Sequence, residues 1–207
     1  MIVIKIDFKK ELSELYNPKK KVFSQVKVPK MKFFMIDGKG DPNTSKEYAH
    51  AIQVLYSVSY TLKFMCKNEL DKDYGVPPLE SLWWAKNMKD FQSGKKENWQ
   101  WTAMIMLPDW IPASMVKSAI ASARERKTDL DFSKLRVEPF AEGLSVQIMY
   151  VGPYKDEGPV ITQMHEQYLP ENKLIPNGKH HEIYLGDPRK SEPSKLKTII
   201  RQPVKKK

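Results

Sequence analysis

The feature that most constrains this fold is an internal repeat in the sequence. The segment Phe-Phe-Met-Ile-Asp-Gly at 33–38 resembles Gln-Ile-Met-Tyr-Val-Gly at 147–152, and Leu-Glu-Ser-Leu-Trp-Trp at 79–84 resembles His-Glu-Ile-Tyr-Leu at 181–185. The copies lie about 110 residues apart, a period far longer than that of solenoid repeats. The chain is therefore expected to consist of two similar halves with approximate two-fold symmetry.

Hydrophobic patterning in the first copy predicts the order strand, helix, strand, strand. The helix begins with a capping box formed by Thr44 and Glu47, and its apolar positions continue to about Lys67. A charged connection that contains Gly94 separates the last two strands. The strands are expected at 31–36, 79–85 and 99–107.

The second copy follows the same order, with strands expected at 144–151, 180–185 and 196–203. Its helix begins near Pro159, places Val160, Met164 and Tyr168 inward, and stops at Pro170 because proline interrupts a helix. One helix covers one face of each unit, so two units must combine to bury the other face. The sequence therefore predicts an α+β fold with two pseudo-symmetric β-α-β-β repeats around a central cleft.

The domain organisation follows from these elements and from the charge. We expect a basic leader, a single domain made of two repeats joined by a helical connection, and a basic tail. The leader spans 1–30, the domain 31–203, its repeats 31–107 and 135–203, the connection 111–127 and the tail 204–207. The net charge of +10 is concentrated in the two ends. Solvated ends are favoured over a polyanion-binding role, because no recognition helix or finger accompanies them.

Several classes of protein are excluded by inspection. No apolar run approaches the roughly 18 residues of a transmembrane helix, and Cys66 is the single cysteine. The sequence contains no P-loop, dinucleotide-binding glycine motif, HExxH or GxSxG. His180 and His181 would point to opposite faces of a strand, so they cannot bind one metal together. We expect a cytoplasmic protein with no metal, no cofactor and no membrane partner.

The candidate site centres on a glutamate inside each of two apolar strands, Glu80 and Glu182. Each could face solvent on a half-exposed strand, but their matching positions in the repeats favour a shared cleft. Aromatic residues surround them in the sequence, and a plain hydrophobic core is the alternative explanation for these. They are Trp83, Trp84, Trp99, Trp101, Trp110, Tyr150, Tyr154 and Tyr184. Such a carboxylate can hold a planar cation between rings, or act as a general base towards water.

A resemblance to a known family rests on two segments, Tyr150-Val-Gly-Pro-Tyr154 and His181-Glu-Ile-Tyr-Leu-Gly-Asp-Pro188. They resemble the GyrI-like (gyrase-inhibitor-like) small-molecule-binding superfamily, and the first half is similar to its stand-alone bacterial branch. The resemblance implies the two-repeat fold and a ligand cleft lined by Glu182. Some stand-alone members hydrolyse cyclopropane-bearing, DNA-alkylating compounds, which implies a catalytic role for Glu182 and, less firmly, for Glu80. The implied walls are Tyr150, Tyr184, Trp84 and Trp101, with Trp83 and Trp110 as further candidates.

The leading hypothesis is a binding protein for planar hydrophobic or cationic xenobiotics. Hydrolysis of electrophilic toxins by water that a glutamate activates would make it a detoxifying hydrolase, and the sequence leaves this open. One alternative is a non-catalytic protein that sequesters ligands or binds effectors. Another is an interaction protein that contacts gyrase or nucleic acid through its basic ends, which should then show salt-sensitive binding.

Overall fold

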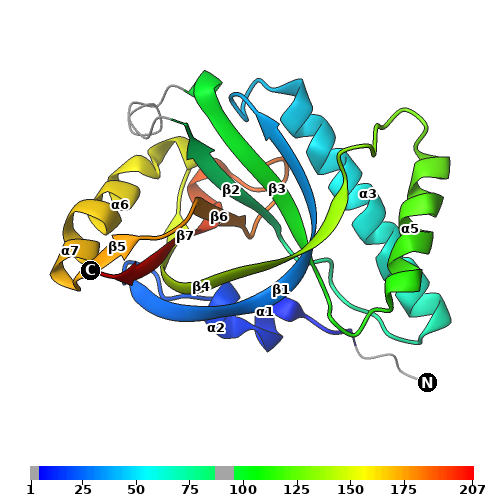
Figure 1. The fold of residues 1–207 in the computed structure, drawn as a ribbon, viewed down its shortest axis with the longest axis horizontal. Helices are drawn as coiled ribbons and strands as arrows, with labels where there is room; N and C mark the ends of the chain where they lie inside the picture. The colour runs from blue at the N-terminus through cyan, green and yellow to red at the C-terminus, as the bar shows by residue number, and fades with distance from the viewer. Residues whose placement is uncertain (1–4, 87–95) are drawn as a thin grey trace. The chain divides into compact units, whose positions relative to one another are not determined.

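The computed structural model describes residues 5–86 and 96–207, which form a mixed structure of helices and antiparallel strands (Figure 1). The helices are α1 (Phe8–Glu11), α2 (Ser13–Tyr16), α3 (Lys46–Glu69), α5 (Ala113–Arg126), α6 (Gly158–Gln163) and α7 (Leu169–Glu171). The strands are β1 (Ser24–Lys39), β2 (Leu79–Ala85), β3 (Trp99–Leu107), β4 (Arg136–Val151), β5 (Leu174–Pro176), β6 (His180–Tyr184) and β7 (Lys197–Lys206). The predicted α+β class is confirmed. Among the described residues, none of the helices has the length and apolar character needed to cross a membrane.

The chain divides into two compact units. Unit 1 comprises residues 1–11, 31–77 and 84–140, and unit 2 comprises residues 12–30, 78–83 and 141–207. Each unit is therefore assembled from stretches that are far apart in the sequence. Strands β1, β2 and β4 contribute residues to both.

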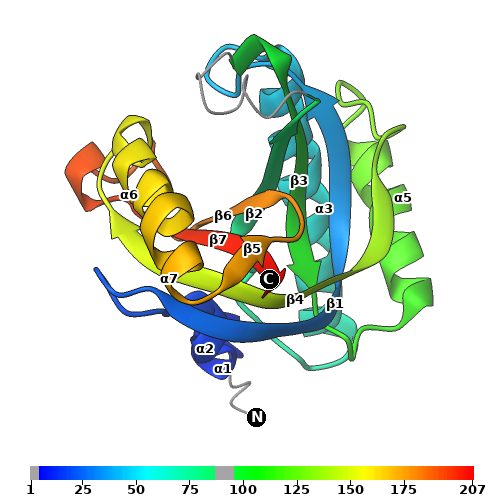
Figure 2. The ribbon, with the colours of Figure 1, turned by 60° about the vertical axis from the view of Figure 1, so that its left-hand side comes forward.

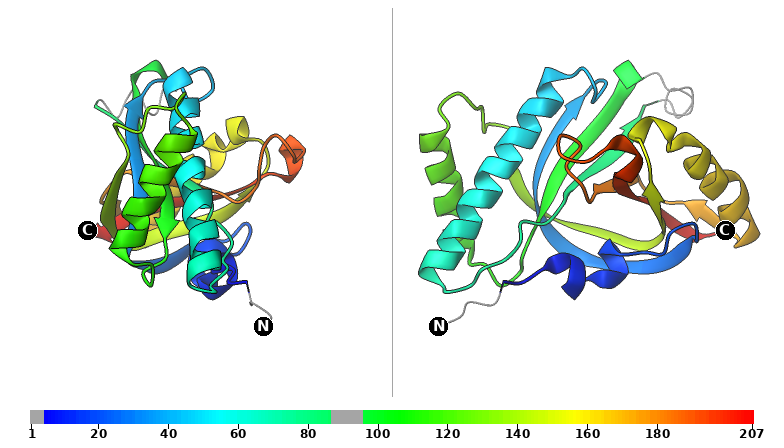
Figure 3. Two further views of the ribbon diagram at one scale, coloured as in Figure 1. Left: turned by 90° about the vertical axis from the view of Figure 1, so that its right-hand side faces the viewer. Right: turned by 180° about the vertical axis from the view of Figure 1, so that it is seen from behind.

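Unit 1 is built on the antiparallel pair β1 and β3, in which Lys32 lies opposite Leu107 and Lys39 opposite Gln100. Helix α3 packs against β3, and α5 lies beside α3, as Figures 1 and 3 show from opposite sides. Helix α3 starts one residue later than predicted, because the capping box was expected to begin at Thr44. Its N-cap is Ser45, whose hydroxyl accepts a hydrogen bond from the backbone N–H of Tyr48 at 3.2 Å.

Unit 2 is an antiparallel sheet in which β7 pairs with β4, β5 and β6, and β6 pairs with β2. Figure 2 shows α6 continuing towards α7, and β5 following α7. A core cluster fills the space between this sheet and the helices. Its buried members are Val146, Ile148, Met164, Leu169, Leu174, Ile200 and Val204.

The helix of unit 2 continues past the proline that was expected to end it. A π-helical turn spans Met164–Tyr168, and the backbone N–H of Leu169 bonds to the carbonyl of Met164. The helix then runs through Pro170 to Glu171. Proline lacks an N–H and clashes with an upstream carbonyl in a regular helix, and a π-turn relieves this locally. The predicted inward positions are confirmed, because Met164 is buried and Val160 and Tyr168 pack against the core cluster.

The remaining elements differ from expectation mainly in length. Strands β2 and β3 have the predicted bounds, whereas β1 begins at Ser24 and β4 at Arg136, both earlier than expected. Strand β5 was not predicted. Part of the expected leader is folded, because it forms α1, α2 and the start of β1. Gly94 lies outside the described residues.

Candidate functional site

The two glutamates of the predicted site project from opposite faces of the unit 2 sheet. Glu80 of β2 lies opposite Ile183 of β6, and Ser81 lies opposite Glu182. Residues directly opposite each other in an antiparallel pair share a face, and successive residues alternate between faces. The expectation that both carboxylates line one cleft is therefore wrong. The sheet has a Glu182 face, which also carries His180 and Tyr184, and a His181 face, which also carries Glu80.

On the Glu182 face, a chain of hydrogen bonds leads to the carboxylate. The Trp83 indole N–H donates to the Tyr184 hydroxyl at 3.2 Å, and this hydroxyl donates to Glu182 Oε2 at 2.7 Å. His180 Nε2 lies 3.3 Å from Glu182 Oε1. The prediction that Glu182 shares a face with Tyr184 and His180 is confirmed. The Glu182 side chain is only 14% exposed, so its carboxylate has little contact with bulk water.

Two further residues belong to these surroundings. The ring of Tyr154 packs edge-on against Tyr184, with centroids 5.4 Å apart. His165 lies on the π-turn, and burial together with the nearby His180 lowers its pKa to about 4. A neutral His165 therefore adds no charge to the site at neutral pH. Sequence reasoning missed His165, whose signal was only a histidine on the predicted helix.

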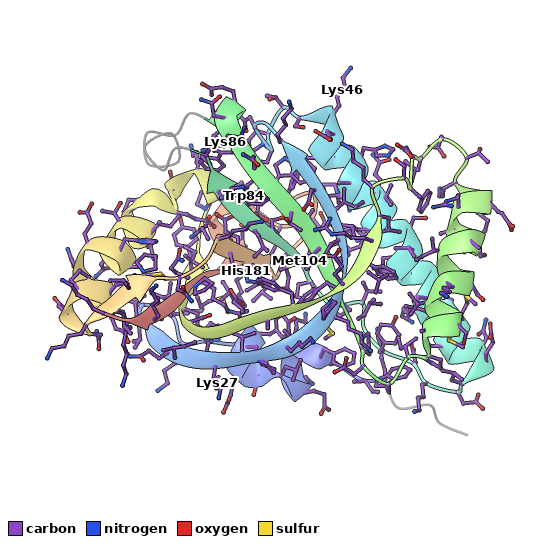
Figure 4. The ribbon with its side chains drawn as sticks, viewed as in Figure 1. Lys27, Lys46, Trp84, Lys86, Met104 and His181 are labelled. Carbon is purple, nitrogen blue, oxygen red and sulfur yellow. The ribbon has the colours of Figure 1, made fainter. Side chains whose placement is uncertain are left out.

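The opposite, His181 face carries a buried ionic network. His181 Nε2 lies 3.0 Å from Glu80 Oε2, and His181 Nδ1 lies 2.9 Å from Glu142 Oε1. Arg201 Nη1 donates to Glu142 Oε2 at 3.1 Å. These four side chains are all at most 1% exposed. Figure 4 labels His181 among the densely packed side chains of the molecule.

The charges of this network hold each other in their ionised forms. Burial disfavours ionisation of Glu142, but His181 and Arg201 outweigh it and lower the pKa of Glu142 to about 2. Burial also disfavours the imidazolium form, yet Glu142 and Glu80 raise the pKa of His181 to about 9. Glu142 is therefore ionised and His181 protonated at neutral pH, so opposite charges face each other, as a buried cluster requires.

The N-terminal segment completes the network. Tyr16 in α2 donates its hydroxyl proton to Glu80 Oε1 at 2.7 Å, and Arg201 Nη2 donates to the carbonyl of Leu15 at 2.6 Å. Burial, and then the Glu80 charge, raise the pKa of Tyr16 well above its ordinary value, so Tyr16 remains a donor. Glu80 thus accepts a hydrogen bond at Oε1 and faces the His181 ring with Oε2, which makes it part of this network. Sequence reasoning missed Tyr16 because nothing in the leader indicated burial.

The other predicted wall residues have separate surroundings. Trp101 lies in unit 1 and is fully buried, packed over Gly38 and edge-on against Tyr48. A Cβ added at Gly38 would lie 2.2 Å from the Trp101 ring, so only glycine fits beneath it. Trp110, also in unit 1, packs edge-on against Tyr74. Both are parts of the unit 1 structure.

Trp84 and Tyr150 complete the predicted set. Trp84 follows Trp83 in β2, so the two rings leave the strand in opposite directions, and Figure 4 shows Trp84 near the end of β2. Tyr150 donates its hydroxyl to the carbonyl of Pro153 at 3.1 Å and packs against the unit 2 core cluster. Of the predicted set, the structure joins Trp83, Tyr184 and Glu182 in one chain of hydrogen bonds, in which Tyr184 is the middle member. Within 5–86 and 96–207, no group of three or more His, Cys, Asp and Glu side chains is placed to bind a metal ion.

Comparisons with known proteins match nearly the whole chain. The profile of the GyrI-like small molecule binding domain matches residues 22–205. An uncharacterised conserved protein from Listeria innocua is 42% identical, with a TM-score of 0.86, over 97% of this chain and 100% of that chain. A protein described as a hydrolase from Listeria innocua is 41% identical, with a TM-score of 0.83 and the same coverage.

A more distant structure shares the fold alone. The C-terminal domain of EcmrR is 13% identical, with a TM-score of 0.58, over 90% of this chain and 98% of that domain. No curated protein is a significant match to the sequence.

Proposed function

Because this chain belongs to the family of GyrI-like small-molecule-binding domains, we propose that it binds planar hydrophobic or cationic xenobiotics at the Glu182 face of unit 2. The observation that carries this proposal is the shielded Glu182 carboxylate, which contacts Tyr184 and His180. A carboxylate that is mostly removed from water attracts a ligand cation more strongly than an exposed one. The Tyr184 and Tyr154 rings supply apolar and π surface beside it.

Hydrolysis of electrophilic ligands is the second candidate. It is supported by the hydrolase description of the 41% identical Listeria innocua protein and by the polar neighbours of Glu182. Glu182 would remove a proton from a water molecule whose oxygen attacks a carbon of an activated cyclopropane. The ring C–C bond breaks, its electrons pass to a conjugated carbonyl group, and the proton that Glu182 took from water returns to the resulting enolate.

The binding proposal is tested with ethidium, a planar aromatic cation, by fluorescence titration. Glu182→Gln keeps the side-chain volume but removes the charge, so we expect ethidium affinity to fall about tenfold. Glu171→Gln is the matched control, because Glu171 is an exposed carboxylate of the same unit. Affinity should change less than about twofold in this control. Equal affinities for the wild-type protein and Glu182→Gln would reject the proposal.

The hydrolysis proposal is tested with a neutral cyclopropane conjugated to a carbonyl group, followed by mass spectrometry. We expect a product that has gained one water molecule. Glu182→Gln should keep substrate affinity within several-fold and lower turnover by about 100-fold or more, because the general base is lost. Stoichiometric binding with unchanged ligand would instead identify a sequestering protein, and unchanged turnover in Glu182→Gln would remove Glu182 from the mechanism.

A further inference from the structure

The buried network on the His181 face has no part in the proposed ligand contacts. It nevertheless includes a residue of β6, the strand that carries those contacts. Strand β6 spans His180–Tyr184, and its central three residues alternate between the two faces. Glu182 points to the ligand side, and its chain neighbour His181 points into the network. Any shift of the His181 backbone is therefore a shift of the adjacent Glu182.

The network ties β6 to the elements around it within unit 2. Glu80 belongs to β2, Glu142 to β4 and Arg201 to β7, and His181 contacts the first two carboxylates directly at 3.0 and 2.9 Å. Arg201 extends the network. Its Nη1 donates to Glu142, and its Nε donates to Gln147 Oε1 at 3.0 Å. Each nitrogen of the His181 ring thus faces a carboxylate, and the ring cannot rotate without losing both contacts.

Because the network is shielded from water, the loss of any of these contacts costs free energy. Every charged member is at most 1% exposed, so an ion without its partner has no water to replace it. Breaking one pair of such a network leaves an uncompensated buried charge, which favours the one arrangement of the strands that keeps every pair. The Glu182 carboxylate, by contrast, lies against the hydroxyl of Tyr184 and His180, both from β6 itself. Its position therefore depends on where β6 lies.

We propose that His181, clamped between Glu80 and Glu142, is a positioning residue that fixes strand β6 and thereby the Glu182 carboxylate on the opposite face. This inference rests on the proposed function, because the property it controls is the ligand contact of Glu182. Disruption of the network weakens ligand binding only through Glu182. Once the Glu182 charge is absent, the same disruption has little left to change.

A double-mutant cycle with ethidium tests this role. His181→Gln should weaken ethidium binding about fivefold to tenfold in the wild-type background and less than about twofold in the Glu182→Gln background. Titrations are run well below each variant's unfolding midpoint. The matched control is Asp73→Asn, which removes the largely buried ion pair of Lys63 and Asp73 in unit 1. It should lower thermal stability without changing ethidium affinity more than about twofold.

The outcomes separate the two proposals. If ethidium binds the wild-type protein and Glu182→Gln equally, the proposed function fails. If Glu182 matters but His181→Gln weakens binding by the same factor in both backgrounds, or by no measurable factor, the positioning role is rejected. If His181→Gln does not fold, Glu142→Gln replaces it in the cycle, because that side chain keeps its volume and its contact with Arg201 while it loses the charge beside His181.

Discussion

His181 and Glu182 are neighbours in the chain with opposite environments. The His181 imidazole is enclosed between two carboxylates, whereas the Glu182 carboxylate is partly open and contacts a hydroxyl and an imidazole. The first arrangement satisfies every charge within the protein, and the second leaves capacity for a ligand. Side-chain alternation along β6 is what allows a structural residue and a binding residue to be adjacent.

The buried charges predict how stability depends on pH. The pKa of His181 is raised from 6.5 to about 9, so its contribution is complete below 6.5 and is lost as the pH rises through about 9. The pKa of Glu142 is lowered from 4.5 to about 2, so its contribution is present above 4.5 and is lost as the pH falls through about 2. Between pH 6.5 and 9, the unfolding free energy should fall by up to about 1.4 kcal/mol per pH unit.

Urea unfolding at a series of pH values measures this dependence. His181→Gln should flatten the slope between pH 6.5 and 9, because the group that binds the extra proton in the native state is gone. A slope that is unchanged in this variant would show that another group titrates.

At the scale of elements, the four-residue helix α2 supplies several hydrogen bonds to the buried network. It is inserted into the network through Tyr16 and the carbonyl of Leu15, and Gln147 Nε2 also donates to the carbonyl of Glu14 at 2.6 Å. These groups occupy hydrogen-bonding positions that water would otherwise have to fill. Leu15 and Tyr16 are thus part of the packed interior of unit 2.

Tyr16→Phe measures the contribution of α2. The substitution removes the proton donor to the buried Glu80 and leaves the ring, so we expect the unfolding free energy to fall by about 2 kcal/mol. Tyr60→Phe is the control, since Tyr60 is 48% exposed, and it should change stability by less than about 0.5 kcal/mol. Similar values for the two variants would mean that Tyr16 does not support the network.

The sequence predicted the elements with strong local patterns. Strands β2 and β3 are rich in tryptophan and aliphatic residues, and α3 has a clear apolar face, so their bounds were close. Strand β5 has three residues and is too short to show a period. The site was predicted in part, because alternation places His180, Glu182 and Tyr184 together. The network was not predicted, because Tyr16, Glu142 and Arg201 are far apart in the chain and meet only through the topology.

For the molecule as a whole, the net charge of +10 is the property most open to misinterpretation. Lysines lie exposed in both ends, at positions 19, 20, 21, 205, 206 and 207. Deleting residues 1–30 to test a polyanion-binding role would also remove Tyr16 and Leu15, and so would confuse lost charge with lost structure. Substitution of these six lysines separates the two effects.

We expect the sixfold Lys→Gln variant to elute from a heparin column at lower salt than the wild-type protein, because fewer cations displace counterions. Its ethidium affinity should stay within about twofold of wild type, since all six lysines are exposed whereas Glu182 lies against Tyr184 and His180 on β6. A parallel loss of ethidium binding would show that the basic ends contribute to the ligand site.

The two-sided use of β6 has a consequence for changes in chain length. One residue inserted or deleted ahead of His181 would exchange the two faces, directing Glu182 towards Arg201 and the imidazole of His181 towards the ligand. Both sets of contacts would be lost at once, although every side chain would still be present. Among variants of this chain, β6 should accept point substitutions far more readily than the insertion or deletion of a single residue.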